Sequence, residues 1–338
     1  MKKIKIFALA AVLLLTACND NIYSQVHSGF FSMDTYMEIT AYGSKGEAAI
    51  ASCKDQICLL EALLSATDDT SDIGRINVSG TTDVSPDTAE IIKYAKQTGE
   101  ETKGALDITI YPVLKAWGFT TGDYSVPDSD TLNALLKKVD FTQIQIEDSA
   151  LPTVTVPIGV QLDLGALAKG YASDKAAEIL KQQGITSALI NLGGNIMTIG
   201  SNPDSGSPWR IGIRNPFSLD ENIGVLEAAD KAVVTSGSYE RCFTAEGGQT
   251  YHHIIDPATG CPARSGLVSV TIVGDSGIMC DALSTALFVM GKDKAVEYHQ
   301  KKGGFDMILV TEEGEIFITE GIADSYTNLT DYPLSLCG

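Results

Sequence analysis

Residues 162–171 have the sequence LDLGALAKGY, which predicts a short strand over 161–164, a glycine loop and the start of a helix. The pattern continues along the chain, because a helix predicted over 169–183 leads into a strand over 187–192. Gly193 and Gly194 follow the end of that strand. The middle of the chain is therefore expected to alternate strands, glycine turns and helices, which is typical of a mixed α/β or α+β fold.

The same periodicity extends over the remaining chain. Strands are expected over residues 33–42, 209–214, 232–236 and 267–273, with a hairpin over 307–319. Helices are expected over residues 47–64, 87–102, 131–139 and 279–290. Residues 65–77 form a polar loop, and residues 104–119 a ligand-facing loop with a short helix. Since there is no internal repeat or linker, we expect one interwoven domain over residues 30–338.

The first residues predict a targeting segment. Lys2, Lys3 and Lys5 precede an apolar run over 6–15, which is well short of the roughly 20 residues that a spanning helix needs. Residues 15–18, LTAC, resemble a bacterial lipoprotein processing site. This resemblance implies a signal peptide over 1–17 and a lipid on Cys18, followed by a polar tether over 18–29. The alternative is a signal peptide that ends near Ala17 beside an incidental cysteine.

We therefore expect an exported lipoprotein, anchored at a membrane in the periplasm or on the outer face of the cell. Loss of the three lysines changes the formal net charge from −19 to −22. So acidic a surface repels nucleic acid, and nucleic acid is excluded as a partner. Six cysteines remain after Cys18, and none belongs to a CxxC or Cys/His cluster with zinc spacing. Their pairing stays open.

Asp281 and Thr285 are the first candidate metal ligands. They lie four residues apart on a predicted helix, so their side chains share one face. Mg²⁺ takes few protein oxygens and completes its shell with phosphates and water. The alternative is that Asp281 caps the helix while Thr285 packs against its neighbours.

His253 is the candidate proton acceptor. It lies in a strand-like run that ends at Asp256, and strand alternation directs His252 to the opposite side. A histidine with a pKa near neutrality can take the proton of an attacking hydroxyl, and Asp256 would orient the turn. The alternative is a structural histidine bonded to the backbone.

The loop over 163–170 opens a helix, where free amides can meet phosphate oxygens. It has neither the GxGxxG nor the GxxxxGK[ST] spacing, so dinucleotide-fold and P-loop motifs are both excluded.

Taken together, eight segments in order resemble the ApbE family of FAD:protein FMN transferases, from about residue 33 to 290. The landmarks are MDT at 33–35, GRIN at 74–77, GALD at 104–107 with Trp117-Gly118, the segment 163–171, NLGGN at 191–195, TSGSY at 235–239, and the segments 253–260 and 281–291. Asp34 stands where many members have glycine.

The resemblance implies an α+β fold of largely antiparallel sheets with flanking helices. It implies a Mg²⁺ ion held by the backbone oxygen of Ala166 and the side chains of Asp281 and Thr285. It places FAD, as the substrate, along Met33, Ser71, Asp72, Ile73, Ala105, Leu106, Asp107, Lys169 and Ile255.

The implied enzyme transfers FMN from FAD to a Thr or Ser hydroxyl of an acceptor protein through a phosphoester bond and releases AMP. The acceptor is expected to be an exported or membrane-bound redox subunit. Two alternatives stay open: a Mg²⁺-dependent FAD pyrophosphatase that gives FMN and AMP, and a lipoprotein that binds FAD without turnover.

Overall fold

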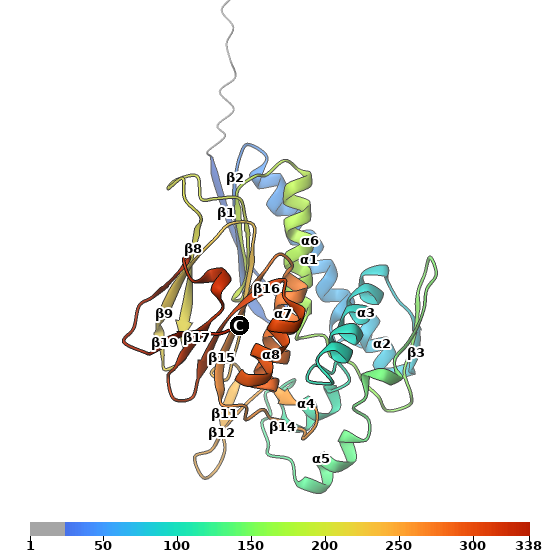
Figure 1. The fold of residues 1–338 in the computed structure, drawn as a ribbon. Coiled ribbons are helices and arrows are strands. Elements are labelled where there is room, and N and C mark those ends of the chain that lie inside the picture. Colours follow the sequence, from blue (N-terminus) through green and yellow to red (C-terminus); the bar gives the residue numbers. More distant parts are fainter. Residues whose placement is uncertain (1–23) are drawn as a thin grey trace, which may run out of the picture.

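A nine-stranded sheet forms the centre of the structure, a computed structural model that describes residues 24–338 (Figure 1). Neighbouring strands are antiparallel except for the last pair, which is parallel. In order across the sheet the strands are β1 (Gln25–Ser32), β2 (Thr35–Tyr42), β6 (Ala188–Leu192), β7 (Asn195–Ile199), β10 (Ala232–Gly237), β15 (Leu267–Gly274), β16 (Phe305–Thr311), β17 (Ile316–Ile318) and β19 (Leu334–Leu336).

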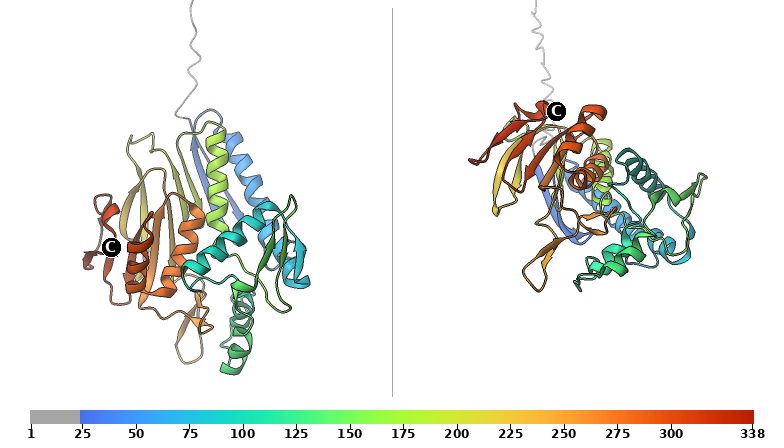
Figure 2. Two further views of the ribbon diagram at one scale, coloured as in Figure 1. Left: turned by 45° about the vertical axis from the view of Figure 1, so that its right-hand side comes forward. Right: turned by 60° about the horizontal axis from the view of Figure 1, so that its bottom comes forward.

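Both faces of this sheet are buried, which explains why its inner strands are almost continuously apolar. Val234 and Ile272 belong to the core under the helices, whereas Val233 and Val273 belong to the core on the other face. The first face is covered by the helices α1 (Gly46–Leu64), α6 (Ala168–Gln182), α7 (Gly277–Met290) and α8 (Lys292–Lys302) (Figure 2). The second face is covered by a three-stranded sheet of β8 (Trp209–Asn215), β9 (Ser218–Ala228) and β18 (Tyr326–Asn328).

The remaining elements lie beside this layered body. A second three-stranded sheet and two helices lie at the right in Figure 1: α2 (Asp72–Ser79), α3 (Pro86–Glu101), β3 (Thr81–Asp83), β4 (Gln145–Glu147) and β5 (Thr153–Thr155). The helices α4 (Tyr111–Trp117) and α5 (Ser129–Leu136) lie below them. Two short hairpins lie at the lower end: β11 (Cys242–Thr244) with β12 (Thr250–His252), and β13 (Ile255–Asp256) with β14 (Cys261–Pro262). Single 3₁₀ turns occur at Phe141–Gln143 and Glu320–Ile322.

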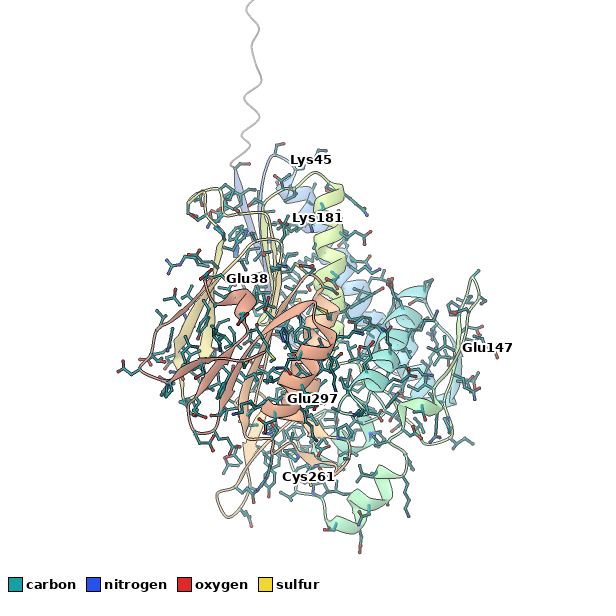
Figure 3. The ribbon with its side chains drawn as sticks, in the orientation of Figure 1. Glu38, Lys45, Glu147, Lys181, Cys261 and Glu297 are labelled. Carbon is teal, nitrogen blue, oxygen red and sulfur yellow. The ribbon has the colours of Figure 1, made fainter. Side chains whose placement is uncertain are left out.

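Charged side chains lie mostly on the outside of these layers. Lys45, Lys181, Glu147 and Glu297, for example, are exposed on four different elements or loops (Figure 3). The described residues bury only three charged side chains below a tenth of their surface, and all three are carboxylates: Asp72, Asp107 and Asp281. Because burying a carboxylate is costly, each of these needs polar or charged neighbours.

The predicted fold class is confirmed, and the expected long helices all form within a few residues of their predicted bounds. Three predictions of elements are wrong. The strand predicted over 33–42 starts at Thr35, because Met33 and Asp34 form the turn between β1 and β2. The strand predicted over 161–164 reduces to one bridge, between Ile110 and Gln161. The loop predicted over 65–77 contains the start of α2, because the Ser71 hydroxyl caps that helix by accepting a hydrogen bond from the Gly74 amide.

The N-terminal boundary also differs from the expectation. Residues 25–29, which the sequence assigns to a tether, belong to β1 and pair along their length with β2. The predicted signal peptide over 1–17, the predicted lipid site at Cys18 and the first part of the tether lie outside the described residues. Within the described part of the chain, no helix combines the length and the apolar character needed to cross a membrane.

Candidate active site

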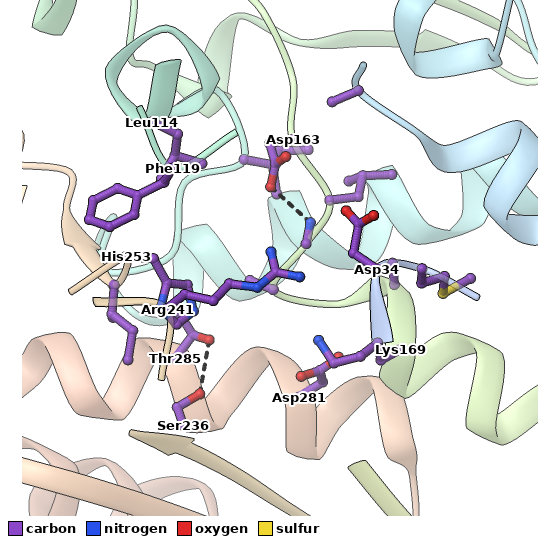
Figure 4. A pocket seen from close by; sticks show the side chains of 18 of the residues that line it. Asp34, Leu114, Phe119, Asp163, Lys169, Ser236, Arg241, His253, Asp281 and Thr285 are labelled. Atoms are coloured by element: carbon purple, nitrogen blue, oxygen red, sulfur yellow. Dashed lines mark hydrogen bonds between the residues drawn. The ribbon is translucent and has the colours of Figure 1, made fainter. Parts of the chain in front are cut away.

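A cavity of about 500 Å³ opens where the helical face of the large sheet meets α4 and the lower hairpins (Figure 4). This volume lies in the usual range of ligand pockets. Its walls come from segments that are far apart in the sequence: residues 33–35, 105–110, 163–169, 193–195, 234–241, 253–257 and 281–285. The segments 163–169, 253–257 and 281–285 overlap three of the landmark segments of the sequence, 163–171, 253–260 and 281–291.

Asp281 is one of two buried carboxylates that line this cavity, and the other is Asp107. The Oδ2 atom of Asp281 accepts a hydrogen bond of 2.8 Å from the amide of Gly170, which lies in the first turn of α6. Burial raises the pKa of Asp281, while the charge of Lys169 and the Gly170 amide oppose this rise. A cation at this carboxylate would therefore relieve the cost of burying it.

Two further oxygen atoms line the cavity with Asp281. Ala166 lies before α6, whose first helical bond runs from the Tyr171 amide to the Leu167 carbonyl. The carbonyl of Ala166 is therefore outside the helical bonds, and it accepts no hydrogen bond among the described residues. The Thr285 hydroxyl lies one turn after Asp281 and 3.3 Å from the Ser236 hydroxyl. A carboxylate, a carbonyl and a hydroxyl are the hard oxygen ligands that Mg²⁺ prefers.

Asp281, Thr285 and Ala166 all line the cavity, so a metal ion there could take one oxygen ligand from each of them. No group of three or more His, Cys, Asp or Glu side chains in residues 24–338 is placed to hold a metal ion. A divalent cation would therefore need the carbonyl of Ala166 and the hydroxyl of Thr285 in addition to Asp281. Phosphate oxygens and water would complete its shell.

Contact between two glycines fixes the relative position of α6 and α7. A Cβ atom on Gly170 would lie 2.3 Å from the carbonyl oxygen of Gly277 and 2.7 Å from Cβ of Asp281. Asp174, on α6, holds the start of α7 by accepting hydrogen bonds from the amides of Gly277 (2.6 Å) and Ile278 (2.9 Å). The two helices thus set the geometry of Asp281 together.

His253 faces the cavity in the neutral form. Its Nδ1 atom lies 3.1 Å from the carbonyl oxygen of Glu240, and since a carbonyl only accepts, Nδ1 carries the proton. Burial lowers the pKa of His253 to about 4, and the positive charge of Arg241 contributes to this shift. The Nε2 atom consequently has a free lone pair near neutral pH and can accept a proton.

His252 has a different role, as expected, but the predicted strand over both histidines does not form, because β12 ends at His252 and His253 lies in the bend before β13. Its Nε2 atom lies 3.1 Å from the carbonyl oxygen of Ala263, and its ring packs edge-on against Phe288 at 5.5 Å between centroids. His252 is therefore a packed structural histidine.

Two basic side chains stand among the carboxylates that line the cavity. Lys169 and Arg241 both line the cavity, and Figure 4 shows Lys169 beside Asp281. Arg241 has a φ of +40°, a conformation that few residues other than glycine adopt. Both charges oppose the burial-induced rise in the pKa of Asp163 and of Glu240. The cavity can thus offer two cations to an anionic ligand.

The turn between β1 and β2 closes another side of the cavity. Met33 and Asp34 have φ values of +48° and +57°, which is the type I′ geometry of a two-residue hairpin. Glu61 of α1 holds this turn, since its carboxylate accepts hydrogen bonds of 2.8 Å each from the Met33 amide and the Ser32 hydroxyl. The turn is therefore fixed by a helix that lies elsewhere in the sequence.

Comparison with known proteins agrees with this geometry. Residues 33–309 match the model of the family described as the ApbE family. The chain belongs to the ApbE family. A relative from Treponema pallidum named FAD:protein FMN transferase is 32% identical over 310 residues, which cover 86% of this chain and 85% of that protein. A Vibrio cholerae protein of the same name is 34% identical over 303 residues, covering 86% and 88%.

Solved structures of ApbE proteins share the fold. The crystal structure of the ApbE protein from Thermotoga maritima superposes with a TM-score of 0.83 at 33% identity, covering 89% of this chain and 99% of that one. The flavin transferase ApbE from Vibrio cholerae gives a TM-score of 0.79 at 29% identity over the same shares.

The cavity brings together most of the site residues that the ApbE resemblance implied. The residues that line it are Met33, Ala105, Leu106, Asp107, Ala166, Lys169, His253, Ile255, Asp281 and Thr285.

Four predicted site residues do not line the cavity, and their placement in the site is corrected accordingly. Ser71, Asp72 and Ile73 are buried at the start of α2, where Asp72 accepts hydrogen bonds from Arg75, the Ser85 amide and Thr88. Asp256 accepts a hydrogen bond from the Ala258 amide. The structure thus gives the first three residues a role in packing and capping, and gives Asp256 a role in its own turn.

Two residues that line the cavity, Arg241 and Asn195, were not among the functional residues predicted from the sequence. Arg241 has no motif of its own, although a lone arginine beside the TSGSY landmark of an acidic ApbE chain is a usable signal. Asn195 was named only as part of the NLGGN landmark, yet its buried side chain lines the cavity. Its amide is close enough to Asp281 to oppose the burial-induced rise in the pKa of that carboxyl group, so Asn195 belongs to the same polar site.

Proposed function

We infer that this chain transfers the FMN part of FAD to an acceptor protein. The observation that carries the inference is one cavity that joins the oxygens of Asp281, Thr285 and Ala166 to the free nitrogen of His253. The names of the relatives, which this chain matches over 85% or more of their length, support the same activity.

The reaction exchanges one phosphorus–oxygen bond for another. A Thr or Ser hydroxyl of the acceptor attacks the phosphorus on the FMN side of the diphosphate, the bond to the AMP phosphate breaks, and AMP leaves. The proton of the hydroxyl passes to Nε2 of His253, and the product is a phosphoester. Lys169 and Arg241 lie where they can stabilise the negative charge that develops on the phosphate oxygens.

The proposed metal is Mg²⁺, held by Asp281, Thr285 and the carbonyl of Ala166. When bound, it would neutralise diphosphate charge that a protein of formal charge −19 otherwise repels. The buried carboxylate of Asp281, whose raised pKa Lys169 and the Gly170 amide only partly offset, supports this assignment.

The proposed location is the outer side of a membrane, with the chain exported and held by a lipid on Cys18. The basic start, the short apolar run and the LTAC sequence support this proposal. An enzyme held there would meet exported or membrane-bound redox subunits, which we propose as its acceptors.

The first experiment identifies the product and the acceptor together. Exported and membrane proteins from source cells that lack this enzyme are mixed with the enzyme, FAD and Mg²⁺. A covalently fluorescent band in a denaturing gel is then cut out and analysed by mass spectrometry. The expected result is an FMN-sized adduct on a Thr or Ser residue; a reaction that binds FAD but gives no adduct contradicts the proposal.

Release of AMP separates transfer from hydrolysis. A transferase releases AMP in proportion to the adduct and slows strongly when the acceptor is omitted, whereas a pyrophosphatase releases AMP at the same rate without it. Asp281→Ala is expected to abolish transfer, and Asp275→Ala is the matched control, because Asp275 is exposed just before α7. An unchanged rate in Asp281→Ala would refute the metal assignment.

A further inference from the structure

Aromatic rings form a continuous row from the cavity to the protein surface. The ring of His253 lies 6.4 Å from that of Phe119, Phe119 lies 5.8 Å from Phe243, and Phe243 stacks on Tyr124 at 4.8 Å with an interplanar angle of 8°. His253 and Phe119 line the cavity, whereas Phe243 and Tyr124 line a shallow hollow outside it. The row of these four rings therefore joins the two depressions.

Apolar side chains are exposed to solvent at the outer end of the row. Tyr124 is 45% exposed and Val126 is 48% exposed, and both border the hollow together with Phe243. The hollow lies between the loop before α5 and the β11–β12 hairpin, which extends beyond the sheets in Figures 1 and 2. A contiguous apolar surface beside a cavity is a common mark of a binding site for a macromolecule.

Packing inside the protein does not account for this outer end. The buried ring of Trp117, 2% exposed, packs against two rings of the hairpin, Tyr251 at 5.0 Å and Phe243 at 6.4 Å. Tyr124 covers one face of Phe243 and leaves its own outer face in solvent. Tyr124 and Val126 thus keep nearly half of their surface exposed, although the hairpin also packs on Trp117.

We propose that the acceptor protein binds here: the surface formed by Tyr124, Val126 and Phe243, which we call the acceptor surface, holds the segment that carries the accepting hydroxyl. The proposal rests on the proposed function, because a transferase must admit a polypeptide to the His253 end of its cavity. The row of rings leads to that end, since Phe119 contacts both His253 and Phe243.

The dimensions and charges of the surface define the segment that fits. The three ring-to-ring steps reach about 17 Å at most, a length that roughly five extended residues cover. Residues 119–126 and 242–252 contain the carboxylates of Asp123 and Glu246 but no lysine or arginine. The fitting partner is therefore an extended segment with an apolar side chain near its Thr or Ser and no acidic residue facing these two carboxylates.

The first test removes the outer ring. Tyr124→Ser is compared with Phe217→Ser, because Phe217 has a matching exposure of 46% but lies between β8 and β9, in another layer of the fold. The acceptor is the protein identified by the gel and mass-spectrometry experiment, in purified form. We expect Tyr124→Ser to raise the KM for this acceptor at least tenfold with FAD affinity unchanged, and Phe217→Ser to change neither by more than about twofold.

The second test adds a charge without removing a ring. Val126→Glu is compared with Leu219→Glu, whose original side chains are 48% and 49% exposed, so neither change is expected to prevent folding. We expect only Val126→Glu to raise the KM for the acceptor, while kcat at saturating acceptor stays constant.

Each outcome is informative. An unchanged acceptor KM in both Tyr124→Ser and Val126→Glu would overturn the proposal, and so would a parallel loss of FAD affinity, which would assign the surface to the nucleotide. Binding of wild-type protein, but not Tyr124→Ser, to anionic phospholipid vesicles with no effect on acceptor KM would mean a membrane contact instead, which also overturns it. Failure of the proposed function is distinct, because the wild-type protein would then give no adduct at all.

Discussion

Replacing Gly170 with alanine tests whether contact between α6 and α7 sets the position of Asp281. The added methyl group would lie 2.3 Å from the carbonyl oxygen of Gly277 and 2.6 Å from its carbonyl carbon, much closer than such atoms approach in proteins. These are backbone atoms, so rotation of a side chain cannot relieve the clash. The two helices must separate by about 1 Å to restore ordinary contact distances.

This separation affects both stability and catalysis. Overpacking at a well-packed contact costs about 1–3 kcal/mol, and each kcal/mol lowers Tm by roughly 2–4 °C in a large domain. Because the amide of Gly170 also bonds to Asp281 at 2.8 Å, the carboxylate is expected to move with the helix. A displacement of about 1 Å at a catalytic group can reduce the rate about 100-fold. The assay is the rate of adduct formation at saturating FAD, measured over a range of Mg²⁺ concentrations.

Gly184→Ala is the control on the same side of the molecule. Gly184 follows α6 with a φ of +84°, and apart from its chain neighbours no atom of residues 24–338 lies within 4 Å of the position that an alanine methyl group would take. Alanine there strains the backbone by about 1–2 kcal/mol without touching α7. It should lower Tm by a similar amount and leave the transfer rate unchanged. A wild-type rate and Mg²⁺ dependence in Gly170→Ala would refute the idea that this contact positions Asp281.

Three other results are expected. The transfer rate should not depend on protonation of His253 between about pH 6 and 8, and should fall as the pH approaches 4, because His253 gains its proton only near its lowered pKa of about 4; a rate that tracks an imidazole pKa near 6.5 would contradict this. Glu61→Ala should raise the Kd for FAD about tenfold by freeing the Met33 turn, measured by flavin fluorescence, and an unchanged Kd would exclude that role. In native protein, a thiol reagent should modify the exposed Cys58, Cys242 and Cys261 quickly, but Cys53 and Cys280 only after unfolding, because burial raises their pKa; rapid modification of Cys53 would show that the helical core opens.

The helices were predictable because their apolar spacing is regular, and their caps are local. Ser276, for instance, caps α7 three residues before Met279, whose amide it binds. The short strands were harder. The pairing of β3 with β5 joins residues about 70 positions apart, and Thr81–Asp83 has no alternation that would reveal it. Such strands exist because of tertiary contacts, which a local pattern does not encode.

The residues of the candidate site also divide into those that a local sequence pattern identifies and those that it does not. Asp281 and Thr285 were identifiable from their spacing on one helix, and the structure places both in the cavity. The carbonyl of Ala166 has no signal of its own in the sequence, because every residue has a backbone oxygen, and only the family resemblance indicated it. Ser71, Asp72 and Ile73 were assigned to FAD only through the family resemblance, whereas in the structure they cap and begin α2.

The hairpin of β1 and β2 has a consequence for an enzyme tied to a lipid layer. β1 begins next to the N-terminal segment, and its other end leads into the turn of Met33 and Asp34 at the cavity. Eight extended residues make a stiff spacer of roughly 26 Å. If the chain is anchored through Cys18, this spacer keeps the opening of the cavity away from the lipid headgroups. The distance at which the enzyme can meet a partner then depends on the length of the segment between Cys18 and β1, and not on bending of the folded domain.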